Sequence, residues 1–122
     1  MFLNHLTKKL VLGAAILVLA CRAFGQSYPT KPINIVVPYP AGGASDFVAR
    51  LFSKEMTSTL KQPILVDNVT GVGGALGVMK TLNAAPDGYT MVISDIAALI
   101  TTPLTNVNAK YKPDEIKTVA ML

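Results

Sequence analysis

The sequence is almost devoid of cysteine and histidine. Its 122 residues contain one of each, Cys21 and His5, and from residue 26 onward neither occurs. Disulfides, thiolate nucleophiles, histidine general bases and His/Cys metal sites are therefore excluded from that segment. This removes most hydrolase, zinc-enzyme and redox functions, and we expect no catalytic residue, no cofactor and no metal ion.

Apolar runs are also short. Leu10–Ala20 is apolar over 11 residues, whereas a membrane-spanning helix needs about 20. Two lysines precede this run and small residues follow it, which is the three-part plan of a secretory signal peptide. We predict a signal peptide at residues 1–25, cleaved after Gly25 or after Ala23. A buried N-terminal helix is the alternative reading.

Cys21 adds a third option for the leader. The stretch Val18–Cys21 weakly resembles a lipoprotein box, in which the cysteine is lipidated, although Leu19 fits that pattern poorly. We favour cleavage, and we expect no stable membrane insertion once the signal peptide has been removed.

The basic excess has its origin in the leader. The chain has 11 lysines and arginines against seven acidic residues, and three of the basic residues precede residue 26. Eight basic residues then face seven acidic ones, so the processed chain is nearly neutral. That balance gives no reason to expect a nucleic-acid partner.

Strand-like and helix-like segments alternate along the remaining chain. Ile33–Val37 is a β-branched run between two prolines, which predicts a buried parallel strand. Residues 45–60 predict a helix that Ser45 or Asp46 can cap. The apolar residues that recur there at helical spacing are Val48, Leu51, Phe52, Met56 and Leu60.

The pattern then repeats. We expect a second strand at Ile64–Asp67, a helix after the glycine-rich stretch Gly71–Gly77, and a third strand at Tyr89–Ser94. Residues 101–112 read as a loop with at most one short helix, and residues 117–122 as the start of another strand. The predicted fold class is α/β, with an open, mostly parallel sheet and flanking helices.

Ligands of open parallel sheets bind beyond the carboxyl ends of the strands, where Pro38–Asp46 lies. Gly42 and Gly43 permit backbone angles that turn several N–H groups toward one point, and a helix start adds partial positive charge. An anion could be held there, with Ser45 as a further donor. The alternative is a tight turn, in which Asp46 serves as a helix cap.

Two further places could carry a site. The stretch GVGGALG resembles the dinucleotide fingerprint GxGxxG only weakly, because Leu76 stands where the third glycine belongs, and close packing explains it equally well. Ser94 and Asp95 end the third predicted strand and could face the same cleft. Tyr39 either forms an apolar wall of the first loop or packs under it.

Three stretches together carry a resemblance to a known family. These are SYPTKPINIVVPYPAGGASDFVARLFSKEM, QPILVDNVTGVGGALG and AAPDGYTMVIS. In order and spacing they resemble the opening of the tripartite tricarboxylate transporter substrate-binding proteins, also called the Bug family. Three motifs in register are far harder to meet by chance than one glycine loop.

The resemblance implies a periplasmic receptor with a two-lobed, type II periplasmic-binding-protein-like fold. Such a receptor closes on a small carboxylate and delivers it to membrane permease subunits, without catalysing a reaction. Residues 26–122 would form an incomplete N-terminal lobe, because family members are two to three times longer. The ligand-binding residues implied are Tyr39, Ala41, Gly42, Gly43, Ala44, Ser45, Asp46, Ser94 and Asp95.

The second motif departs from the family pattern. The family usually has Asn-Arg-Pro-Gly where this chain has Asn68, Val69, Thr70 and Gly71, which puts a polar contribution from this loop in doubt. A truncated, non-functional remnant of such a receptor is one alternative. A nucleotide-binding enzyme fragment is the other.

Overall fold

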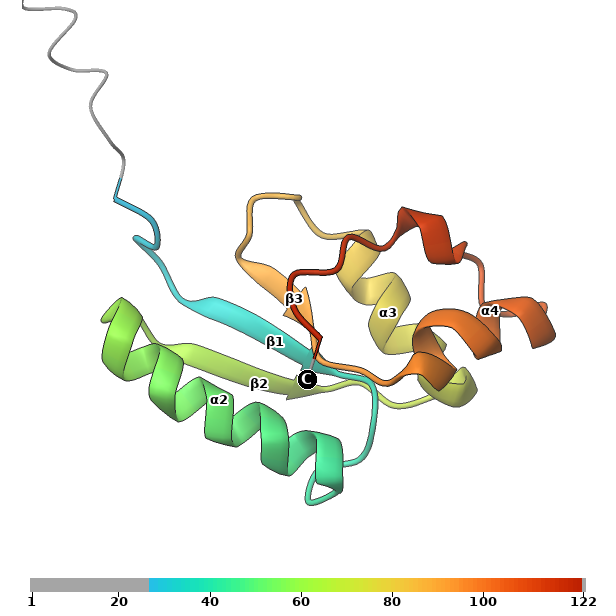
Figure 1. Cartoon of the computed structure of the whole chain (residues 1–122), viewed down its shortest axis with the longest axis horizontal. Helices are drawn as coiled ribbons and strands as arrows, with labels where there is room; N and C mark the ends of the chain where they lie inside the picture. The colour runs from blue at the N-terminus through green and yellow to red at the C-terminus, as the bar shows by residue number, and fades with distance from the viewer. Residues whose placement is uncertain (1–26, 122) are drawn as a thin grey trace, which may run out of the picture.

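The computed structural model describes residues 27–121. The predicted signal peptide, its cleavage sites and Cys21 lie outside the described residues. Strands and helices alternate as expected (Figure 1), and none of the helices in the described region is both long and apolar enough to cross a membrane. The elements are β1 (Ile33–Val37), α2 (Ala44–Leu60), β2 (Ile64–Asn68), η2 (Val72–Gly74), α3 (Ala75–Leu82), β3 (Thr90–Val92), η3 (Ala97–Thr101), α4 (Thr102–Thr105) and η4 (Pro113–Glu115).

The three strands form one parallel sheet in the order β2-β1-β3. β1 is central: Ile35 lies opposite Val66 of β2 and Met91 of β3. This position explains why β1 carries the most apolar strand sequence, since neighbouring strands and covering helices remove it from water. The predicted open parallel sheet with flanking helices is confirmed.

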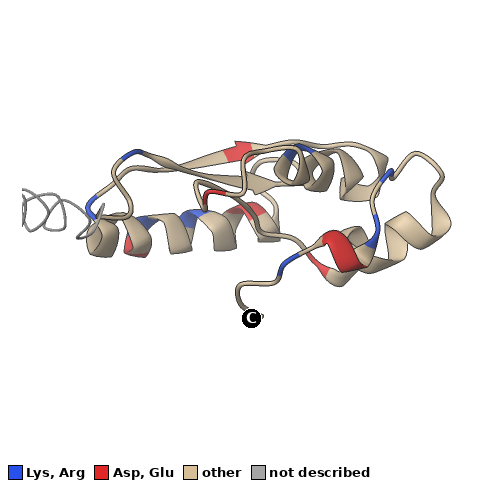
Figure 2. Ribbon diagram, turned by 90° about the horizontal axis from the view of Figure 1, so that it is seen from above, with Lys and Arg blue, Asp and Glu red and all other residues tan. Residues whose placement is uncertain are grey.

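Helices cover both faces of the sheet. Ile35 and Val37 of β1 pack with Ala49 of α2, while Val92 of β3 packs against the cluster that contains Val78 of α3. Because side chains alternate across a strand, these two clusters lie on opposite faces. Basic and acidic residues are interspersed along the ribbon, and the long helix α2 carries both (Figure 2).

The buried face of α2 differs from the predicted one. Asp46, Ala49 and Ser53 are buried, whereas Leu51 and Phe52 are 53% and 38% exposed. The helical spacing of the apolar residues predicts a buried face that includes Leu51 and Phe52, and this expectation is wrong for both. Small side chains let the helix approach the sheet closely, and Ser53 satisfies its hydroxyl by donating to Ala49 O at 2.7 Å.

The last third of the chain departs further from expectation. β3 ends at Val92, and helical structure begins at Ala97, inside a region without a predicted helix. Residues 117–121 form no strand, and Val119 is 86% exposed. An apolar run becomes a strand only when a neighbouring strand accepts its backbone hydrogen bonds, and among residues 27–121 none lies beside it.

The segment before β1 is fastened to the turn before β3. The Tyr28 hydroxyl donates to Gly88 O at 2.6 Å, and the Thr30 N–H donates to Tyr89 Oη at 2.9 Å. Lys31 Nζ lies 3.1 Å from Asp87 Oδ2 and 4.2 Å from the centre of the Tyr89 ring. These contacts between residues about 60 positions apart hold the segment that enters β1 beside the segment that enters β3.

Candidate functional site

The two candidate loops meet at the carboxyl edge of the sheet. The loop after β1 begins at Pro38, and the loop after β3 contains Ser94 and Asp95. The Tyr39 hydroxyl joins them, because it donates to Asp95 Oδ1 at 2.6 Å. Asp95 Oδ1 also accepts the Ala98 N–H at 3.0 Å.

Tyr39 is thus a polar link between the loops as well as a packing residue. Desolvation by burial and the neighbouring Asp95 raise the pKa of Tyr39 to about 12, so the hydroxyl keeps its proton and remains a donor at neutral pH. Tyr39 also contacts both hydrophobic clusters. Tyr39 therefore packs against the sheet and links the loop after β1 to the loop after β3.

The backbone of the first loop differs from the predicted anion nest. Gly42 has φ +83°, which favours glycine, but Gly43 has φ −79° and is the N-cap of α2. The Gly42 N–H already donates to Asp46 Oδ2 at 2.8 Å, and the Gly43 N–H makes a longer bond of 3.4 Å to Pro40 O. The Gly42 N–H is therefore bonded within the protein and is not one of the free donors of the predicted anion site.

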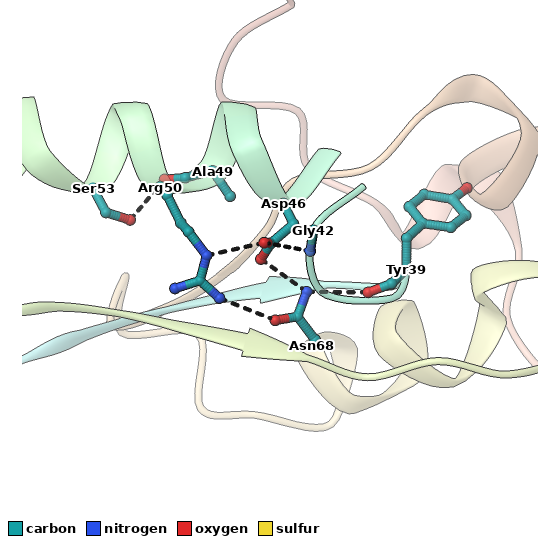
Figure 3. A network of polar contacts seen from close by, with 7 residues as sticks. All are labelled: Tyr39, Gly42, Asp46, Ala49, Arg50, Ser53 and Asn68. Atoms are coloured by element: carbon teal, nitrogen blue, oxygen red, sulfur yellow. Dashed lines mark hydrogen bonds and ion pairs between the residues drawn. The ribbon is translucent and has the colours of Figure 1, made fainter. Parts of the chain in front are cut away.

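Asp46 lies in the first turn of α2 and closes a polar network (Figure 3). Its Oδ2 accepts from Gly42 N–H and from Arg50 Nε at 2.9 Å, and its Oδ1 accepts from Asn68 Nδ2 at 3.0 Å. The bond to Arg50, followed by that to Gly42, lowers the pKa of Asp46 to about 2.

This network corrects the predicted helix cap. Neither Ser45 nor Asp46 is the N-cap residue. Asp46 instead reaches back from inside the helix to the N–H preceding the cap, in the manner of a capping box. Its negative charge is paired with Arg50, so it does not oppose an anion at the helix start as an unpaired carboxylate would.

The free hydrogen-bond donors of the site are the first N–H groups of α2. Within residues 27–121, the N–H groups of Ala44, Ser45 and Asp46 donate no hydrogen bond to a group outside α2. The partial positive charge of a 17-residue helix is concentrated at this end. Ser94 Oγ is buried beside the Tyr39 hydroxyl, and this contact acts to lower the pKa of Tyr39 against the stronger raising effects.

The glycine-rich stretch Gly71–Gly77, between β2 and α3, allows close packing. A Cβ on Gly77 would lie 2.8 Å from Pro38 Cβ and 3.2 Å from Val69 O, and one on Gly74 would lie 2.7 Å from Ala98 Cβ. These glycines therefore let α3 approach the end of β1 and the start of η3. Val72 has φ +52°, a strained conformation for a β-branched residue.

Two residues of the network were missed by reasoning from sequence. Neither is among the candidate ligand-binding residues, and Asn68 belongs to the motif that departs from the family pattern. The spacing of Asp46 and Arg50, four residues apart on a helix, is the signal that indicates their pairing. Nothing local indicates that Asn68 contacts the first loop, 29 residues earlier. No group of three metal-ligating acidic, histidine or cysteine side chains occurs in the part of the chain that the structure describes.

Comparisons with known proteins agree with this architecture. Residues 48–122 match the family described as the tripartite tricarboxylate transporter family receptor. Protein BugT of Bordetella pertussis is 36% identical over 87 residues, which are 71% of this chain and 27% of that protein. The structure of MatC from Rhodopseudomonas palustris, solved with bound malate, is 37% identical with a TM-score of 0.67. The match covers 71% of this chain and 30% of that one.

A second structure from R. palustris, solved with adipate, is 28% identical with a TM-score of 0.68, covering 72% of this chain and 29% of that one. The chain therefore spans a little over a quarter of the curated relatives that it matches first. It has the fold of part of a periplasmic binding protein.

Proposed function

This chain belongs to the tripartite tricarboxylate transporter receptor family, and we propose that the whole protein is an extracytoplasmic receptor for a small carboxylate. In this proposal the receptor binds its ligand in the periplasm and delivers it to the membrane permease subunits of a tripartite transporter. It catalyses no reaction and needs no cofactor.

One observation carries the proposal. Within residues 27–121, the N–H groups of Ala44, Ser45 and Asp46 donate no hydrogen bond to a group outside α2, and they lie at the carboxyl edge of a parallel sheet. Backbone N–H groups at a helix start bind carboxylates without any basic side chain. The nine residues named from the family resemblance remain the proposed ligand-binding set, with these N–H groups as its donors.

The class of ligand is inferred from the relatives. MatC was solved with malate, and the second R. palustris structure with adipate, both dicarboxylates. A dicarboxylate offers one carboxylate to the start of α2, and Ser94 and Asp95 lie on the adjoining loop. The close packing of Gly74 and Gly77 against Pro38, Val69 and Ala98 weighs against the alternative of a nucleotide-binding enzyme.

The experiment removes one donor while preserving the helix. Ala44 is the first residue of α2, where proline is tolerated, and Gly43 before it has the extended conformation that proline requires. Ala44→Pro therefore deletes one N–H at little cost in stability. Ala44→Val is the matched control, because it adds a side chain of similar size and keeps the N–H.

Binding of malate and adipate to the whole purified protein is measured by isothermal titration calorimetry. We expect Ala44→Pro to weaken the binding of whichever acid binds by about tenfold, as for the loss of a hydrogen bond to a charged group, and Ala44→Val to change it less than about threefold. Binding of NAD or ATP but of no carboxylate would refute the proposal. A protein that binds none of these compounds would favour the non-functional remnant.

A further inference from the structure

We propose that Asn68 is a positioning residue, which with Asp46 and Arg50 holds the loop 39–43 in its binding geometry and does not itself touch the ligand. This inference rests on the proposed function for its ligand, but the loop contact it describes is independent of any ligand.

The first step concerns how Asn68 reaches the loop. Asn68 is the last residue of β2, and β2 runs parallel to β1 with Val37 opposite Asn68. Its side-chain amide donates to Tyr39 O at 3.1 Å and to Asp46 Oδ1 at 3.0 Å (Figure 3). One amide group thus joins the start of the loop, on one side, to the first turn of α2 on the other.

The second step concerns Asp46, whose carboxylate is occupied by the protein itself. It accepts from Gly42 N–H, Arg50 Nε and Asn68 Nδ2, and the residue is only 3% exposed. A carboxylate whose oxygens already have three donors, and which is shielded from solvent, is a structural anchor of the loop. This assigns Asp46 a different role from the direct ligand contact that the family resemblance implies.

The third step links the anchor to the free donors. Gly42 has φ +83° and precedes Gly43 and Ala44, so the bond from its N–H to Asp46 sets the direction in which the chain enters α2. The free N–H groups of Ala44 and Ser45 follow immediately. Binding sites depend on such supporting contacts, because donors misplaced by about 1 Å lose much of their effect.

The chain offers a matched control on the same helix. The buried hydroxyl of Ser53 donates to Ala49 O at 2.7 Å, and its dashed line in Figure 3 leads to none of Asp46, Arg50 and Asn68. Ser53→Ala therefore removes a buried hydrogen bond of α2 and leaves the loop alone. Asn68→Ala removes the two hydrogen bonds that Asn68 donates to the loop and its anchor, and the longer bond of 3.5 Å that it accepts from Arg50 Nη2.

Both variants of the whole protein are compared with wild type by calorimetric titration with malate and adipate. Hydrogen–deuterium exchange of the peptide spanning residues 38–46 is measured without ligand. We expect Asn68→Ala to weaken binding at least about tenfold and to speed exchange of this peptide, whereas Ser53→Ala leaves both unchanged even if it lowers the unfolding midpoint. If Asn68→Ala does not fold, Arg50→Met replaces it, since this side chain is 56% exposed, and we expect faster exchange and weaker binding.

The outcomes separate the two proposals. Unchanged exchange in the Asn68 variant refutes the loop contact. Faster exchange with wild-type affinity refutes the positioning role, and so does an equal loss of affinity in Ser53→Ala. If the wild type binds neither acid, the proposed function fails, while the exchange data still decide whether Asn68 holds the loop.

Discussion

Gly77 is the position at which two physical effects oppose each other most clearly. It lies inside α3, where replacing glycine with alanine ordinarily stabilises a helix by about 1 kcal/mol. A Cβ at this position, however, would stand 2.8 Å from Pro38 Cβ, 2.9 Å from Pro38 Cα and 3.2 Å from Val69 O. Two of these neighbours are backbone atoms, which cannot move aside as the end of a flexible side chain can.

The relative sizes of the two effects decide whether Gly77→Ala stabilises or destabilises the protein. Overpacking a well-packed interior costs about 1–3 kcal/mol, and more where the backbone itself must shift. The contacts at Gly77 belong to the severe end of that range, because α3 would have to move away from the end of β1. We therefore expect Gly77→Ala to lower the free energy of unfolding by about 1–2 kcal/mol after the gain in helix propensity is included.

The assay is urea-induced unfolding followed by far-ultraviolet circular dichroism of the purified protein. Thr59→Ala is the control, since Thr59 is exposed on α2 and its replacement should raise the free energy of unfolding by a few tenths of a kcal/mol through propensity alone. An unfolding midpoint for Gly77→Ala at or above that of wild type would refute the packing argument. It would also reopen a ligand-binding role for the glycine-rich stretch.

Three further predictions follow from the polar contacts. The folded-state pKa of Asp46 is about 2, below the ordinary 3.8, so the contribution of its carboxylate to stability should be complete above about pH 4 and lost as the pH falls toward 2. In thermal unfolding between about pH 2 and 5, the unfolding temperature of Asp46→Asn should therefore fall less steeply with decreasing pH than that of wild type. Tyr39→Phe should lower the free energy of unfolding by about 1.5–3 kcal/mol, because Asp95 loses a donor; a change under about 0.5 kcal/mol in urea unfolding would contradict this link. Lys31→Met should cost less than about 1 kcal/mol in the same assay, since the Lys31 side chain is 57% exposed in its ion pair with Asp87; a larger loss would indicate that the N-terminal attachment depends on this pair.

Much of the fold was predictable because its signals are local. The β-branched run at Ile33–Val37 between two prolines indicates a buried strand, and the structure places it at the centre of the sheet. The glycine-rich stretch before α3 was expected either to pack or to bind phosphate, and the contacts of Gly74 and Gly77 support packing. Residues 117–121 show the limit, because an apolar run cannot reveal whether a partner strand is present.

Some features of the candidate site also follow from the sequence, and others only from the tertiary structure. The sequence by itself determined that a glycine loop leads from a buried strand into a helix, and therefore that free N–H groups lie at the carboxyl edge of the sheet. Only the tertiary structure decided which face of α2 is buried and that the Gly42 N–H turns inward to Asp46. Asp46 also accepts a hydrogen bond from Asn68, which is distant along the chain and becomes a neighbour of the loop only when β2 pairs with β1.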